Sequence, residues 1–138
     1  MDVVQYLFDS GIDIMIGHSP HMPQAIGKIT TTEEEGGVAE EKLAFFSLGN
    51  FILRPEYIMP SQAHTTIVPK LDINAESNIM NVTIYTVRID NDGIPYLEEK
   101  RKNDIISKVA KASDEEFYTS VNVHDNVGQI SVKLQPPE

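Results

Sequence analysis

The sequence predicts a mixed α/β fold, because apolar residues follow helical spacing in one segment and strand-like patterns in several others. The helical spacing lies within residues 2–10. Alternation over Ile12–Ile16 predicts a strand with one buried face, and the apolar run Leu43–Leu48 predicts a strand buried on both faces. Two longer segments, Thr65–Ile73 and Ile79–Ile89, are rich in β-branched residues and predict further strands. We therefore expect a three-layer α/β fragment, in which the helix packs on a sheet that holds the first two strands as neighbours.

The first third of the chain contains clear boundary signals. Gly11 follows the predicted helix at the position where glycine commonly ends one. Residues 30–42 combine a threonine run, a glutamate run and two glycines, so we expect an exposed acidic insertion loop there. A role for Glu33, Glu34 and Glu35 in ion binding is the alternative to a purely solvated loop.

The later elements are predicted from turn and cap signals. Asn91-Asp92-Gly93 indicates a tight turn into a short strand at 94–97. Asp104 caps a helix with one apolar face, and Ser113-x-x-Glu116 has the pattern of a capping box that opens one further turn. The remaining residues, 117–138, read as a polar tail outside the main domain. They contain an alternating segment, a candidate edge strand, at Ile130, Val132 and Leu134.

Composition narrows the classes of function. The 138 residues carry 21 acidic and 11 basic side chains, which gives a net charge of −10. Such a surface repels the phosphates of nucleic acids and of anionic lipids, so we expect no nucleic-acid partner. The absence of cysteine excludes disulfides and thiolate zinc sites. The sequence has neither a signal peptide nor an apolar run of transmembrane length, and it leaves the cellular location open.

The strongest functional signal is the motif Gly17-His18-Ser19-Pro20-His21. It begins where the Ile12–Ile16 strand ends, and open α/β sheets place ligand sites at the carboxyl ends of their strands. Pro20 stiffens the turn, so we expect His21 to point back toward the space near His18. Two neutral imidazoles there could bind a transition metal such as Zn, Mn, Fe or Ni. The spacing is also compatible with two solvated loop histidines or with capping side chains.

A second motif places this loop in a wider context. Ser47-Leu48-Gly49-Asn50-Phe51 closes the next predicted strand, and Gln24 lies shortly after the histidine motif. With the Asp-Ser-Gly-Ile-Asp turn at 9–13, these features resemble the C-terminal half of the bacterial capsule-synthesis CapA family. These are poly-γ-glutamate biosynthesis proteins with a calcineurin-like metallophosphatase fold. The resemblance covers residues 1–116, most weakly after residue 75.

The resemblance implies a fold, a metal centre and a chemistry. The fold is the C-terminal portion of an α/β/β/α sandwich with a mixed sheet. His18 and His21 would help to hold a divalent metal pair (Mn, Zn, Fe or Mg), which activates a water and polarises a phosphoryl oxygen. The implied activity is that of a metal-dependent phosphoesterase-like hydrolase. Gly17, Gln24 and Asn50 would line the site, although Gln24 and Asn50 are also explained as ordinary turn residues.

The other motifs of a metallophosphatase centre are absent from the sequence. Asp-x-His, Gly-Asp-x-x-Asp and Gly-Asn-His-Asp/Glu do not occur, and Phe51 prevents Gly49-Asn50-Phe51 from replacing the last of these. Two histidines cannot supply the bridging carboxylates of a two-metal centre. We therefore expect this chain alone to bind metal weakly and to be inactive. His64 and His124 are further candidate ligands that no motif supports.

These observations leave two interpretations of function. The first is a partial CapA-like metallophosphatase domain over residues 1–116, associated with capsule or poly-γ-glutamate biosynthesis and completed by an N-terminal half-domain. The full-length family is compatible with a cell-envelope association. The alternative is a non-catalytic remnant that acts by self-association or with a partner chain, because half of a sandwich leaves unpaired strand edges and an uncovered apolar face.

Overall fold

The computed structural model describes residues 3–31, 39–52, 61–97 and 104–134. Within these ranges the chain forms two α-helices, one short 3-10 helix and eight strands. In chain order the elements are α1 (Val3–Asp9), β1 (Ile14–Ile16), β2 (Ile26–Thr31), β3 (Glu40–Phe45), η1 (Ser61–His64), β4 (Thr65–Asn74), β5 (Ile79–Ile89), β6 (Pro95–Leu97), α2 (Asp104–Phe117), β7 (Asn122–His124) and β8 (Val127–Lys133).

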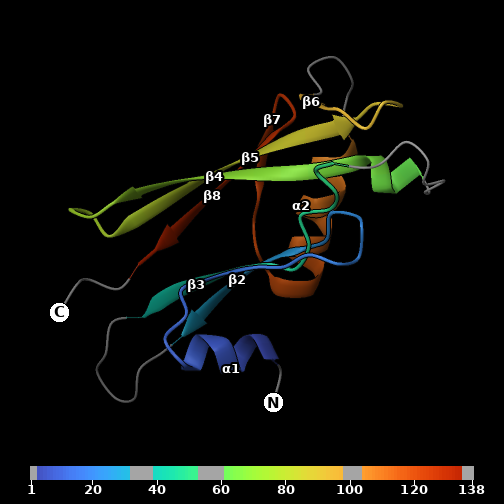
Figure 1. The fold of residues 1–138 in the computed structure, drawn as a ribbon. Coiled ribbons are helices and arrows are strands. Elements are labelled where there is room, and N and C mark those ends of the chain that lie inside the picture. The colour runs from blue at the N-terminus through green and yellow to red at the C-terminus, as the bar shows by residue number, and fades with distance from the viewer. Residues whose placement is uncertain (1–2, 32–38, 53–60, 98–103, 135–138) are drawn as a thin grey trace.

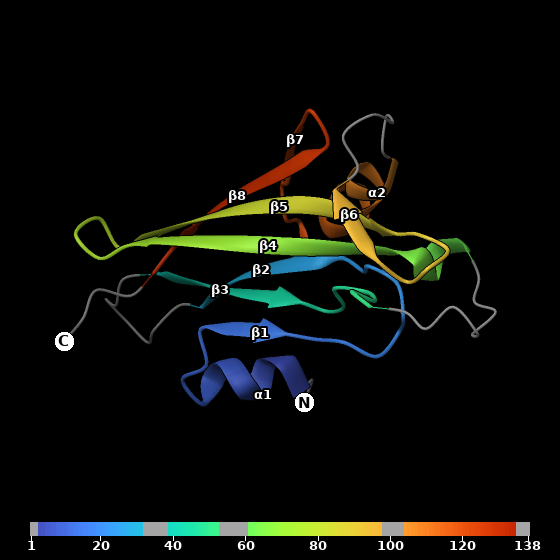
Figure 2. The ribbon, with the colours of Figure 1, turned by 45° about the horizontal axis from the view of Figure 1, so that its top comes forward.

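The strands form two sheets that pack face to face (Figure 1). The first sheet has the order β1-β3-β2, in which β1 is parallel and β2 antiparallel to β3. The second has the order β4-β5-β8-β7, and β6 also pairs with β5. Helix α1 covers the face of the first sheet that is turned away from the second sheet (Figure 2), while α2 lies beside β2. The expected mixed α/β class is confirmed.

The main core lies between the two sheets, because alternate residues of the facing strands turn inward. On β5, Met80 and Val82 are buried, whereas Asn81 between them is exposed. Helix α2 adds Ile106 and Val109 to the same core. The other buried members are Ile26, Leu43, Phe45, Ile67, Ile84, Ile130 and Val132.

The predicted N-terminal helix is confirmed, and its C-terminal cap explains where it ends. Gly11 adopts a φ of 91°, which residues with a Cβ rarely adopt. Its N–H donates to the Phe8 carbonyl oxygen at 3.0 Å, and the Ile12 N–H donates to the Leu7 carbonyl oxygen at 3.1 Å. This pair of bonds is a Schellman motif, which turns the chain directly into β1.

The predicted pairing of the first two strands is also confirmed, although β1 begins at Ile14 instead of Ile12 and β3 covers Glu40–Phe45 instead of Leu43–Leu48. β1 and β3 are parallel neighbours, with Ile14 opposite Leu43 and Ile16 opposite Phe45. On the outer face of this sheet, Ala44 of β3 packs against α1. Because β1 and β3 run in the same direction, the loops that follow them leave the sheet at the same edge.

The expected loop at 30–42 is shorter than its composition suggests. Residues 30 and 31 belong to β2 and residues 40–42 belong to β3, while residues 32–38 and the three glutamates at 33–35 lie outside the described residues. Lys42 explains how a strand forms in so charged a segment: its ammonium contacts Asp13 at 2.7 Å and Glu40 at 3.0 Å. Burial by itself lowers the pKa of Lys42, but the hydrogen bonds to both carboxylates outweigh it and raise the pKa above its ordinary value.

The second sheet follows the predicted strands closely. β4 and β5 form a long antiparallel hairpin from Thr65–Arg88 to Asn74–Ile79. The predicted turn at 91–93 leads into β6, because the Asp90 carboxylate accepts the N–H groups of Asp92 and Ile94. An Asx-type turn of this kind satisfies the backbone where the strand ends.

The predicted capping box at Ser113 is wrong, because α2 continues through it to Phe117. Ser113 is fully buried, and its hydroxyl donates to the Val109 carbonyl oxygen at 2.7 Å. The same hydroxyl accepts the N–H of Ile26 on β2 at 2.8 Å. Thr119 Oγ1 accepts the next outward N–H of β2, that of Lys28, at 2.7 Å. Two side-chain hydroxyls therefore close the outer edge of the first sheet. Neither α1 nor α2 is long and apolar enough to cross a membrane.

The C-terminal segment contributes two strands to the second sheet. The alternation at Ile130 and Val132 corresponds to β8, and both side chains are buried. β8 pairs with β5 from Ile79–Lys133 to Tyr85–Val127, and its first three residues pair on the other side with β7. The strand therefore lies between two others at its N-terminal end.

Candidate functional site

The two sequence motifs meet at the edge where β1 and β3 end. The Gly17 N–H donates to the Phe45 carbonyl oxygen at 2.7 Å, and the Leu48 N–H donates back to the Gly17 carbonyl oxygen at 3.2 Å. A Cβ at position 17 would collide with the Phe46 carbonyl oxygen. Glycine is therefore needed at position 17 for the backbones of the two loops to approach this closely.

Gly49 fulfils a similar requirement in the second motif. It adopts a φ of 86°, and a Cβ there would lie 2.6 Å from the Thr65 carbonyl oxygen. The Leu48 carbonyl oxygen accepts the Ile67 N–H at 2.9 Å, so the motif is joined to β4 of the second sheet. The Ser47–Asn50 turn is thus fixed between both sheets, and this fixes the position of Asn50.

Asn50 makes three hydrogen bonds, two to His21 of the histidine loop and one to Ala63 of η1. Its Nδ2 donates to the His21 carbonyl oxygen at 3.3 Å and to the Ala63 carbonyl oxygen at 3.0 Å. Its Oδ1 lies 2.9 Å from His21 Nδ1. Because the two carbonyl partners require the amide nitrogen on their side, Oδ1 faces the ring and a neutral His21 carries its proton on Nδ1. The lone pair of Nε2 is then available to a ligand, which is the arrangement common in metal-bound histidines.

The backbone of the histidine loop is strained at two residues. Ser19 has a φ of 108° and His21 a φ of 61°, and both carry a Cβ. Non-glycine residues adopt such angles at a cost of roughly 1–3 kcal/mol, and they cluster at functional sites. The hydrogen bonds between Asn50 and His21 stabilise the loop in this strained backbone conformation.

Among the residues that the structure describes, none of the other candidate ligand histidines has a hydrogen bond to Asn50 like the one that orients His21. His18 lies on the same loop, is exposed, and makes no hydrogen bond or ion pair within the described residues. His64 ends η1 and follows Ala63, the residue whose carbonyl holds Asn50. His124 lies on β7, where its Nδ1 is 2.9 Å from Asp125 Oδ2. Across the described part of the chain, no three His, Cys, Asp or Glu side chains form a group that could hold a metal ion.

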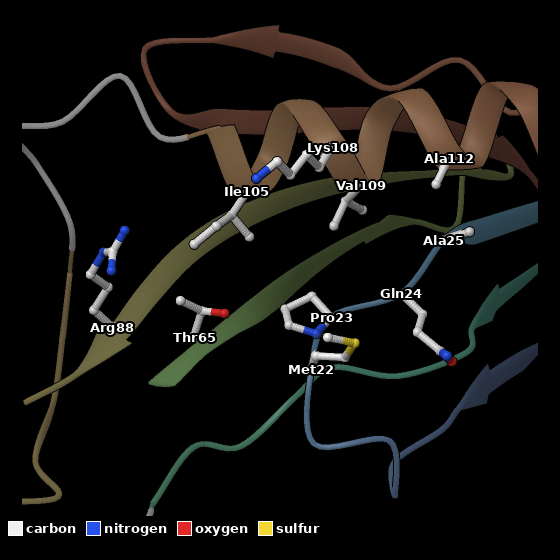
Figure 3. Close-up of a pocket in the computed structure, with 10 residues that line it drawn as sticks. All are labelled: Met22, Pro23, Gln24, Ala25, Thr65, Arg88, Ile105, Lys108, Val109 and Ala112. Atoms are coloured by element: carbon white, nitrogen blue, oxygen red, sulfur yellow. The ribbon is translucent and has the colours of Figure 1, made fainter. Parts of the chain in front are cut away.

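A pocket of about 390 Å³ lies behind the histidine loop (Figure 3). Gln24 is one of its lining residues, with its side chain pointing away from α2 (Figure 3), and the Gln24 N–H donates to the Ser47 carbonyl oxygen at 3.1 Å. Of the polar residues that line this pocket, sequence reasoning names Gln24 but does not identify Thr65, Arg88 or Lys108. The available signal is the alternation along β5, which places Arg88 on the same face as the buried Ile84. The lining residues are Met22, Pro23, Gln24, Ala25, Thr65, Arg88, Ile105, Lys108, Val109 and Ala112.

Comparison with known protein families gives a match to the first part of the chain. Residues 1–55 match the family model described as bacterial capsule synthesis protein PGA_cap. The matched segment contains both motifs, whereas the part of the expected resemblance after residue 55 lies outside the match. Neither a curated protein nor a solved structure matches the chain.

Proposed function

We propose that this chain, whose residues 1–55 match the family model described as bacterial capsule synthesis protein PGA_cap, contributes a histidine loop to a divalent-metal site in a metallophosphatase-like domain. The hydrogen bond between His21 Nδ1 and Asn50 Oδ1 carries the proposal. It orients the ring and leaves Nε2 as the ligand atom. His18, on the same exposed loop, is the second proposed ligand.

The residues of this chain would prepare the ligands rather than complete the centre. A divalent pair of Mn, Zn, Fe or Mg, when bound, supplies an activated water and polarises a phosphoryl oxygen. Gly17 permits the close contact between the two loops, and Asn50 holds His21 in its strained conformation. Bridging carboxylates would come from residues outside the described part of the chain. The proposed reaction class is phosphoester hydrolysis in capsule or poly-γ-glutamate synthesis.

The open edge of β1 supports the view that another polypeptide segment completes the domain. Leu43 N–H bonds to Asp13 and Gly17 N–H bonds to Phe45, so the peptide groups of Ile14 and Ile16 point away from β3. Among the described strands none pairs with this edge. We propose that an N-terminal half-domain of the metallophosphatase sandwich adds its sheet here.

The same edge supports the second candidate function, a non-catalytic protein that self-associates. Ile16 of β1 is 51% exposed and Ile12 beside it is 42% exposed. Exposed apolar residues along an unpaired strand favour pairing with another chain. In this case two copies would join through β1, and the histidine loop would have no catalytic role.

Metal titration distinguishes these functions. We expect Mn²⁺ to broaden the imidazole NMR signals of His18 and His21 at lower concentrations than those of His124, because paramagnetic broadening reports proximity to the ion. His21→Ala should weaken this binding, and His124→Ala, at the exposed His124 on β7, is the matched control. Equal broadening at His124, or unchanged binding in His21→Ala, would refute the metal-site proposal.

Activity measurements provide the complementary test. We expect negligible hydrolysis of a chromogenic phosphate monoester by this chain with Mn²⁺, Zn²⁺ or Mg²⁺, because two imidazoles leave the ion with too few ligands. Turnover that disappears in His21→Ala would instead show that a complete site forms within this chain.

A further inference from the structure

The pocket behind the histidine loop has features of a ligand site that the proposed metal chemistry does not use. It opens between α2, the paired residues Thr65 and Arg88 of β4 and β5, and the segment Met22–Ala25 (Figure 3). Its volume of about 390 Å³ lies at the small end of the range for small-molecule pockets, roughly 300–1,000 Å³. His21 does not line it.

The polar groups of the pocket favour an anion. Arg88 and Lys108 bring positive charge from different elements, and Thr65 adds a hydroxyl. None of the ten lining residues is acidic, although the whole chain has a net charge of −10. Both cations take part in other polar interactions, so an anion would share them. A guanidinium can bind a carboxylate through two parallel hydrogen bonds, which makes Arg88 the expected anchor.

Apart from Gln24, the remaining lining is apolar. Ile105 lies beside the two cations, and the other apolar residues lie toward the middle and the opposite end (Figure 3). Figure 3 shows Arg88 and Lys108 near the start of α2, with Ala112 and Ala25 toward the opposite end. The other apolar lining residues are Met22, Pro23, Ile105 and Val109. An inorganic anion would leave this apolar surface in contact with water, whereas a ligand with a short hydrocarbon body would cover it.

We propose that this pocket binds a small organic acid, with its carboxylate at Arg88 and Lys108 and its apolar body against Val109 and Pro23. Such a ligand would also contact the histidine loop from behind. Met22 follows His21 directly, and Pro23 pairs with Leu48 of the second motif. Occupation of the pocket would therefore restrain the segment that carries His21. This inference concerns a site separate from the metal ligands and does not depend on the proposed hydrolase function.

Sodium hexanoate, tested on the whole chain, is the direct probe. We expect it to shift the methyl NMR signals of Met22, Ile105 and Val109 saturably. Sodium acetate, hexanol and inorganic phosphate should each bind about tenfold more weakly or less, since each lacks either the apolar body or the carboxylate. Equal binding of hexanol or of phosphate would overturn the assignment to organic acids.

Three variants locate the site. Lys108→Gln removes a pocket charge on an exposed part of α2 and should weaken hexanoate binding about tenfold. Ala112→Phe fills the apolar end and should abolish binding. Lys111→Gln is the matched control, because Lys111 lies on the same helix outside the pocket and pairs with Glu115. Amide spectra check that each variant is folded. Binding that is unchanged in both Lys108→Gln and Ala112→Phe would overturn the proposal.

Discussion

At the scale of single residues, Asn50 has the most consequences, since one amide connects three segments of the chain. It contacts the ring and the carbonyl of His21 and the carbonyl of Ala63. A substitution there removes the orientation of the ring as well as hydrogen bonds that hold the loops. The effects on stability and on the tautomer of the neutral His21 ring can be measured independently of any metal.

We expect Asn50→Ala to lower the free energy of unfolding by about 1–2 kcal/mol, because two carbonyl groups lose their donor. In the wild type, the neutral His21 ring should carry its proton on Nδ1, and in the variant the proton should shift toward Nε2. Urea unfolding measures the first effect and nitrogen-15 chemical shifts measure the second. Asn81→Ala, at an exposed position on β5, is the control. The same tautomer in both proteins would contradict our account of the loop.

At the scale of elements, the edge of β2 depends on hydroxyls supplied from α2 and the residues after it. Ile26 is fully buried, so its N–H has no access to water as an alternative to the Ser113 hydroxyl. An unsatisfied buried donor costs more than an average hydrogen bond contributes. Helix α2 is therefore held to the first sheet by hydrogen bonds as well as by apolar packing.

Ser113→Ala should lower the free energy of unfolding by about 1–3 kcal/mol, because the buried Ile26 N–H loses its acceptor. Ser107→Ala, which removes the same atom from an exposed position on α2, should change it by less than about 0.5 kcal/mol. Chemical denaturation of both variants provides the comparison. Equal, small effects would show that water or another group replaces the serine hydroxyl.

Glu41 connects β3 to β8 and makes the stability depend on pH. Its carboxylate lies 2.8 Å from Lys28 Nζ and accepts the Lys133 N–H at 2.8 Å. Burial by itself raises the pKa of Glu41, but these hydrogen bonds and the charges of the two lysines outweigh it, so the pKa is lowered. A carboxyl with a lowered pKa stabilises the folded state above its unfolded pKa, and this contribution is lost as pH falls through the folded value.

We therefore expect the free energy of unfolding to fall as the pH drops below 4.5, the ordinary pKa of this carboxyl. In Glu41→Gln the decrease should be smaller, because the titrating group is gone. Glu116→Gln, on the exposed face of α2, serves as the control. Urea midpoints measured across this pH range test the prediction, and it fails if the wild type and Glu41→Gln lose stability in parallel.

The sequence predicts a helix or strand where one residue pattern extends over the whole element. It misses elements whose formation depends on tertiary contacts. β5 is predictable because its eleven residues are rich in β-branched side chains, and its burial alternates from Ile79 to Thr86. β2 is not, since its charged and threonine-rich end is stabilised by partners such as Glu41 and Thr119. The same distinction applies to the candidate site. The position of the histidine loop follows from the end of β1, whereas the contact with Asn50 depends on the pairing of two strands, and the pocket cations come from separate elements.

At the scale of the whole molecule, the strand edges are protected unevenly. The hydroxyls of Ser113 and Thr119 cover β2. On β4 the Ile67 N–H donates to the Leu48 carbonyl oxygen, and Pro69 has no N–H to offer another strand. β1 has neither kind of protection within the described residues. The net charge of −10 opposes indiscriminate aggregation, but it does not cover the apolar residues along this edge.

We expect the purified chain to form a dimer or higher oligomer at micromolar concentrations, or to fold poorly unless co-expressed with an N-terminal partner. Ile16→Lys should shift the equilibrium toward monomer, because a charge on an edge strand opposes pairing. Ile73→Lys is the control, since Ile73 is also exposed but lies on β4. Sedimentation equilibrium measures the association. A cooperatively unfolding monomer of the wild type would show that the chain is a self-sufficient domain.

The position of β8 in the second sheet has a consequence for folding during translation. β5 emerges early, yet its partner on one side begins at Val127, after α2 and β7 have been made. Met80 and Val132 face each other in this pairing and both are fully buried. β6 pairs with the end of that flank, at Val87–Ile89, but until residue 133 has left the exit tunnel the part from Ile79 to Tyr85 has no strand beside it. The nascent chain therefore exposes an unpaired edge of β5 until β8 has been synthesised. During this interval a chaperone can bind that edge and prevent aggregation.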